Sequence, residues 1–122
     1  SSLPLDAHFV ARIQAMRGDD CGACAQLNVR MAAEAGVDRE LLRTLVENPD
    51  ALPGPLADVR TFADQVVGGA PVDPSLRDRL LEAYGPQGLG ELSTAIAGSR
   101  LYPTLKRALR PEDRCAPLTA DV

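Results

Sequence analysis

The sequence predicts an all-α fold of about six helices, in a single domain of 122 residues. No alternating apolar–polar pattern of useful length occurs, and no Asn-Gly or Asp-Gly pair marks a hairpin turn. Apolar residues instead recur every three or four positions, between the glycines, prolines and aspartates that are typical of helix ends. This spacing and punctuation favour helices over strands along the whole chain.

Three helices are predicted in the N-terminal half. The first ends at Gly18, and the second runs from about Asp20 to Ala35, with Gly36 in the position of a C-terminal capping glycine. Asp38 caps the third, which stops before Pro49. The apolar faces expected to be buried are Leu5, Phe9, Ile13 and Met16, with Val10 beside them, in the first helix, and Leu41, Leu42, Leu45 and Val46 in the third.

Three more helices are predicted after the loop ENPDALPGP. The fourth ends at the pair Gly68-Gly69, and the fifth starts at the cap Asp73 with a proline in its first turn and ends before Gly85. The last runs from about Gln87 to Leu109, with a kink or break expected near Pro103. Residues from about 110 onward are expected to form an irregular tail. The expected apolar stripes are Leu56, Val59, Phe62, Ala63, Val66 and Val67, followed by Leu76, Leu80, Leu81 and Tyr84.

Composition excludes several function classes. The net charge of −4 argues against binding to nucleic acid, which needs clustered Lys and Arg. No apolar run approaches the roughly 20 residues that span a bilayer, and no signal peptide is visible, so a cytoplasmic protein is expected. Because the chain starts at Ser-Ser, we expect it to be part of a longer protein. Aromatic residues are only 3%, so apolar faces are expected to remain for partner subunits.

The segment DDCGACAQLN contains the residues that imply chemistry, the C-x-x-C pair Cys21 and Cys24. At the start of a helix, unpaired N–H groups and the helix dipole favour a thiolate, and two thiols at this spacing can form a disulfide. The alternatives are half of a zinc site, with His8, Cys115 and carboxylates as the remaining ligands, or two inert cysteines. Redox chemistry is the leading hypothesis, with no metal or organic cofactor, and Cys115 is expected to be a thiol in the tail or a third redox partner.

The order of these motifs resembles that of the carboxymuconolactone decarboxylase superfamily, and within it the alkyl hydroperoxidase D-like (AhpD-like) proteins. The residues that carry the resemblance are CGACAQLN (21–28), AAEAGVD (32–38), RTFADQVV (60–67) and ELSTAIA (91–97). It covers most of the chain between Asp6 and Leu109. The resemblance implies an AhpD-like helical bundle that assembles as a homo-oligomer, a trimer or a hexamer.

In the peroxidase-type members, the resemblance implies that Cys24 attacks the peroxide and Cys21 resolves the product to a disulfide. A proton relay in those proteins uses a histidine four residues after the second cysteine and an acidic residue twelve before the first. Here these positions hold Asn28 and Phe9, so the relay is incomplete. Asn28 is one helical turn from Cys24, and its amide is expected to hydrogen-bond a thiolate. His8, next to Phe9, is either a substitute relay group or an ordinary surface or interface histidine.

Three functions compete at this point. The first is a thiol–disulfide oxidoreductase that reduces small-molecule peroxides and takes electrons from an external dithiol. The second is a non-catalytic or redox-sensing oligomeric member of the same fold, which the missing relay residues favour. The third is lactone decarboxylation, but that branch does not use a C-x-x-C pair.

Overall fold

The computed structural model describes residues 3–18, 22–109 and 118–120. Within these ranges the chain forms α-helices and one short 3₁₀ helix and has no strand, which confirms the all-α prediction. None of the helices in the described ranges combines the length and the apolar character needed to cross a membrane. The elements are α1 (Leu5–Gly18), α2 (Gly22–Ala35), α3 (Arg39–Glu47), η1 (Pro49–Ala51), α4 (Gly54–Gly68), α5 (Pro74–Ser99) and α6 (Leu101–Leu109).

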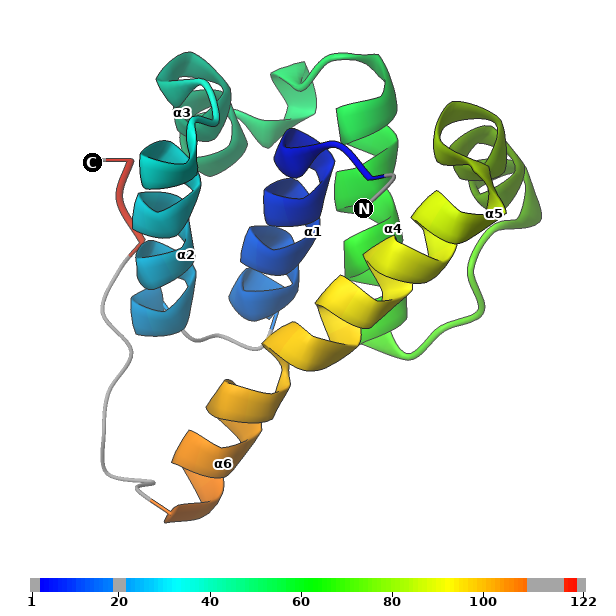
Figure 1. Cartoon of the computed structure of the whole chain (residues 1–122). Coiled ribbons are helices and arrows are strands. Elements are labelled where there is room, and N and C mark those ends of the chain that lie inside the picture. Colours follow the sequence, from blue (N-terminus) through cyan, green and yellow to red (C-terminus); the bar gives the residue numbers. More distant parts are fainter. Residues whose placement is uncertain (1–2, 19–21, 110–117, 121–122) are drawn as a thin grey trace.

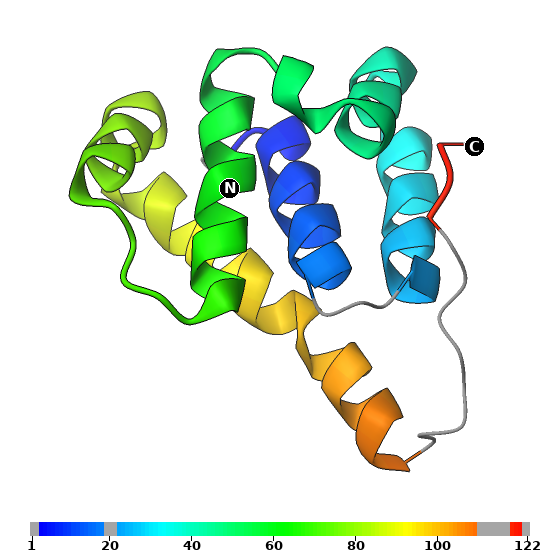
Figure 2. The same cartoon turned by 180° about the vertical axis from the view of Figure 1, so that it is seen from behind.

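Helix α1 lies at the centre of the fold, between α2 and α4 (Figures 1 and 2). It packs most extensively against α4, then against α2 and α5. Helix α3 and the 3₁₀ helix η1 connect α2 to α4 at one end of the bundle. Helix α6 continues from the end of α5 and extends away from the other helices.

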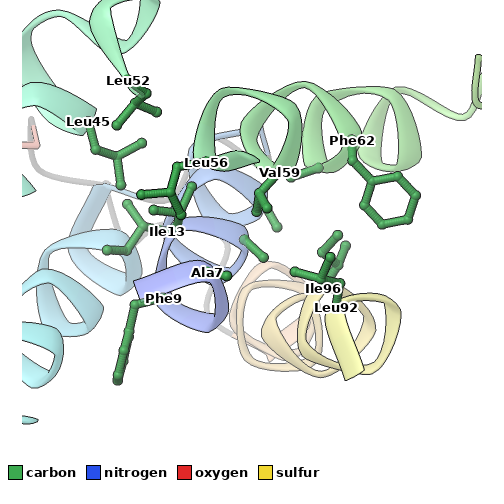
Figure 3. Close-up of a cluster of buried hydrophobic side chains, with 14 of the residues drawn as sticks. Ala7, Phe9, Ile13, Leu45, Leu52, Leu56, Val59, Phe62, Leu92 and Ile96 are labelled. Atoms are coloured by element: carbon green, nitrogen blue, oxygen red, sulfur yellow. The ribbon is translucent and has the colours of Figure 1, made fainter. Parts of the chain in front are cut away.

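Because three helices surround α1, it is buried on more than the single face that the sequence predicted. Phe9, Ile13 and Met16 are buried as expected, but Leu5 is exposed, so its predicted burial is wrong. Val10, expected beside that face, is buried too. The additional buried residues of α1 are Ala7, Ala11, Gln14 and Ala15. Figure 3 shows part of the core that results, with Ile13 of α1 near Leu45, Leu52 and Leu56.

Two predicted N-caps are confirmed. The side chain of Asp38 accepts a hydrogen bond from the backbone N–H of Glu40 at 3.2 Å. At α5, the side chain of Asp73 accepts one from the backbone N–H of Ser75 at 3.1 Å. Each aspartate satisfies an N–H group that has no partner within its own helix, which fixes where the helix begins.

Glycines interrupt the helices at two predicted positions. Gly36 follows α2 with φ +104°, and the next residue, Val37, donates its N–H to the carbonyl of Ala32 at 2.9 Å, as in a Schellman motif. Gly85 has non-helical φ 76° and ψ 173°, so α5 consists of two helical segments, 74–84 and 86–99. Positive φ is strained for residues other than glycine, so a glycine at the end of a helical pattern indicates a break. Both breaks could be predicted for this reason.

The break predicted near Pro103 is present, and it falls at Arg100. Helix α5 ends at Ser99 and α6 starts at Leu101. Proline has no N–H to donate to the carbonyl four residues earlier, here that of Ser99, but it is tolerated in the first turn of a new helix. The proline therefore breaks the helix upstream of its own position.

Candidate functional site

Cys24 is in the first turn of α2, as the C-x-x-C prediction requires, and its side chain is only 5% exposed. It belongs to a small apolar cluster with Met16 of α1 and Ala25. Its predicted partner Cys21 lies outside the described residues. The cluster places the sulfur of Cys24 at the α1–α2 interface rather than on the outer surface of α2.

Asn28, one turn after Cys24, is the centre of a hydrogen-bond network. The residue is 3% exposed, and its Nδ2 donates to the carbonyl oxygen of Cys24 at 3.1 Å and to Sδ of Met16 at 3.2 Å. Its Oδ1 accepts from Nε of Arg12 at 2.9 Å. Both amide hydrogens of Asn28 are thus used in this arrangement by groups other than the Cys24 sulfur, which the sequence had suggested as their acceptor.

Arg12 is the residue of this network that sequence reasoning missed. It is half-buried, and burial lowers the pKa of its guanidinium, although arginine remains charged at neutral pH. Among the described residues, Arg12 forms no ion pair with a carboxylate, and its hydrogen bond goes to the neutral amide of Asn28. The available signal was its spacing, because His8, Arg12 and Met16 recur every four residues along one side of α1.

His8 is half-buried and contacts Phe9, with ring centroids 5.2 Å apart in an edge-to-face arrangement. Burial lowers its pKa below the usual value, the charge of Arg12 lowers it further, and Glu91 of α5 partly offsets both. His8 therefore lies in the charged surroundings of Arg12 and Glu91 and is mostly neutral at pH 7. Phe9, at the position where the resemblance would place an acid, is a buried part of the core.

This lowered pKa predicts a pH dependence of stability. The folded state binds a proton at His8 less readily than the unfolded chain does. Neutral His8 therefore contributes fully to the stability of the fold above its ordinary pKa of 6.5, and this contribution is lost as the pH falls below that value. We expect the free energy of unfolding in urea to fall between about pH 7.5 and about pH 5.5. His8 is the only histidine of the chain, so His8→Gln should make this part of the profile flatter. An unchanged slope in the variant would contradict the assignment.

A C-terminal segment covers part of the same site. Leu118 packs against the cluster of Met16, Cys24 and Ala25. The backbone N–H and the Oγ1 of Thr119 donate to Oε1 of Gln26 at 2.8 and 3.1 Å. Residues 118–120 are thereby held on the first half of α2, whereas Cys115, the predicted tail thiol, lies outside the described residues.

A separate polar cluster joins α1, α3 and α4. Nε2 of Gln14 donates to Oδ1 of Asp64 at 2.8 Å, and Asp64 forms a longer ion pair with Arg60 at 3.9 Å. Arg17 donates to the carbonyl of Leu45 at 2.7 Å, near the C-terminus of α3. A cation at this end of a helix complements its dipole, so we assign this cluster to the stability of the fold.

Metal binding receives no support from the part of the chain that the structure describes. In these ranges no three His, Cys, Asp or Glu side chains come together as ligands. Structural zinc needs four such ligands in tetrahedral geometry. Cys21 and Cys115, two of the ligands considered in the sequence analysis, lie outside these ranges.

Comparisons with known proteins add no identification. No family model matches the sequence, and neither the curated proteins nor the solved structures contain a match to the chain.

Proposed function

We propose that the protein is a thiol–disulfide oxidoreductase that reduces organic peroxides with Cys21 and Cys24. The observation that carries this proposal is the environment of Cys24. The residue lies in the first turn of α2, and Asn28 connects its carbonyl group to the half-buried guanidinium of Arg12. Burial in the apolar cluster with Met16 disfavours the thiolate, the reactive form of cysteine, whereas a helix N-terminus and a nearby cation favour it. The proposal requires that the second effect is the larger. The resemblance to AhpD-like proteins supports the same chemistry.

The reaction is a two-electron exchange. The thiolate of Cys24 attacks the terminal oxygen of the peroxide, the O–O bond breaks, and the alkoxide leaves as an alcohol after taking up a proton. Cys24 becomes a sulfenic acid, which the thiol of Cys21 attacks to form a disulfide and release water. An external dithiol then reduces the disulfide by thiol–disulfide exchange. The two sulfur atoms supply both electrons.

Arg12 and Asn28 have different roles in this proposal. Arg12 supplies positive charge at Asn28, one turn after Cys24, and Asn28 holds the guanidinium in place through its Oδ1. Neither side chain exchanges a proton readily at neutral pH, so proton transfer must come from solvent or from His8. We therefore expect a lower rate than in proteins that carry a histidine at the position of Asn28.

The test is a thiol titration and an intact-mass measurement before and after one equivalent of cumene hydroperoxide. The wild-type protein should lose two thiols and two hydrogen masses without gaining oxygen, because the disulfide is internal. Cys24→Ser should consume no peroxide, and Cys21→Ser should stop at an oxygen adduct on Cys24. If Cys21 and Cys24 remain reduced in the wild-type protein at excess peroxide, the proposal is wrong.

One observation favours the second candidate, a redox sensor. Leu118 and Thr119 pack on the part of α2 that a Cys21–Cys24 disulfide would rearrange. In a sensor, oxidation would release this C-terminal segment and change what it contacts. A second measurement, peroxide consumption in the presence of excess external dithiol, separates the two candidates. An oxidoreductase should consume many equivalents of peroxide, whereas a sensor that keeps its disulfide should consume one.

A further inference from the structure

Large apolar side chains are exposed in two rows. Along α6, Leu101, Leu105 and Leu109 are 66%, 55% and 75% exposed. On α2, Leu27 and Met31 are 58% and 43% exposed. Among the described residues, the one other exposed large apolar side chain is Leu5, on α1. Rows of this kind on a helix are typical of a surface that another helix covers.

Helix α6 needs a packing partner on physical grounds. It has nine residues, and isolated helices shorter than about 12–15 residues are only marginally stable in water. Its contacts with the rest of the chain are mainly with α5, and it extends away from the bundle in both views (Figures 1 and 2). Its three leucines recur every four residues, so they form one continuous ridge along the helix.

The two rows have matching geometry. Leu27 and Met31 are also four residues apart, so each helix presents a ridge of the i±4 type. Packing of two such ridges is the commonest class of helix–helix contact in globular proteins. Both rows are exposed in the same structure, so the described residues of one copy do not cover them.

The charge distribution favours a second copy as the occupant. Residues 100–109 contain three basic side chains, Arg100, Lys106 and Arg107, and no acidic one. The remainder of the chain has ten basic and 17 acidic residues. A basic helix on an acidic body is electrostatically complementary to another copy of the same molecule.

We propose that α6 of one copy packs across Leu27 and Met31 on α2 of a second copy. A reciprocal exchange gives a two-fold dimer, and a head-to-tail exchange gives a closed ring such as the expected trimer. Since α2 also carries Cys24, α6 of the second copy would lie along the helix that contains the candidate redox site. The contact does not depend on the proposed redox function, because it rests on exposure, spacing and charge.

The first experiment measures the mass of the full chain by light scattering at micromolar concentration. The wild-type mass should be that of a dimer or a larger assembly of the 12.9 kDa chain. Leu105→Glu and Met31→Glu should each reduce it to 12.9 kDa. Leu5→Glu is the matched control, because Leu5 is 46% exposed but belongs to neither row, and its mass should equal that of the wild type. Far-UV circular dichroism confirms that each variant is folded.

A second experiment locates the contact. A photo-crosslinking amino acid at position 105, in a mixture of isotopically light and heavy copies, should yield mixed-isotope crosslinks to peptides of 22–35. A wild-type mass of 12.9 kDa overturns the proposal. So does an assembly that survives either Leu105→Glu or Met31→Glu. Crosslinks that remain within one copy, or that reach a helix other than α2, overturn it as well.

Discussion

Replacing Asn28 with histidine should accelerate peroxide reduction by about 10²–10⁴-fold, the range that general acid–base catalysis typically contributes. Asn28 is buried one turn after Cys24, and its amide cannot accept a proton from a thiol at neutral pH. An imidazole can. The neighbouring charge of Arg12 would disfavour its protonation and so maintain the neutral form that accepts the proton. The measurement is the steady-state rate of cumene hydroperoxide consumption with excess dithiol.

Asn28→Leu is the matched control for this variant. Leucine has a similar volume, but it cannot transfer a proton, so its rate should not exceed that of the wild-type protein. Both variants disturb the bonds to Arg12 and Met16, so loss of structure affects them alike and is monitored by thermal unfolding. If folded Asn28→His is no faster than the wild type, position 28 does not transfer protons in this site.

Arg12→Gln should make Cys24 less reactive at neutral pH. The guanidinium is half-buried and connected through Asn28 to the carbonyl group of Cys24, so its charge is screened less than that of a surface residue. A positive charge within about 4–6 Å lowers the pKa of a carboxyl group by about 1–3 units, and the effect on a thiol works in the same direction and weakens with distance. We therefore expect the midpoint of the pH profile of alkylation to rise by about one unit, which is about a tenfold loss of rate below that midpoint. Peptide-resolved mass spectrometry separates Cys24 from the other two cysteines.

Arg30→Gln provides the comparison for Arg12→Gln. Arg30 is on the same helix as Cys24 but is exposed, and its substitution changes the net charge by the same amount. Its alkylation profile should match that of the wild type. Equal shifts in the two variants would mean that Arg12 acts only through the overall charge of the protein. No shift in Arg12→Gln would remove Arg12 from the account of Cys24.

The features of the fold that could be predicted from sequence are local. Asp38 and Asp73 satisfy N–H groups two residues away, and Gly36 and Gly85 adopt conformations that few other residues tolerate. The environment of α1 could not be predicted, because its partners α4 and α5 are far away in the chain. Periodicity identifies an apolar face but does not count how many helices will cover it.

In the candidate site too, local features could be predicted from the sequence and contacts between distant segments could not. The C-x-x-C spacing placed Cys24 in the first turn of α2, since this depends on neighbouring residues alone. The contact of Arg12 with Asn28 joins two helices, and that of Thr119 with Gln26 joins opposite ends of the chain. No local pattern in the sequence contains such pairings.

The central position of α1 also sets the order in which the protein can fold during synthesis. Ala7 and Val10 share a core with Leu92 and Ile96 of α5, so the ribosome must complete most of the chain before this core can close. Until then the apolar sides of α1 have only their neighbours in α2, α3 and α4 to pack against. Contacts between residues so distant in sequence slow folding and expose apolar surface in the meantime. We therefore expect nascent chains that end before α5 to depend on chaperones.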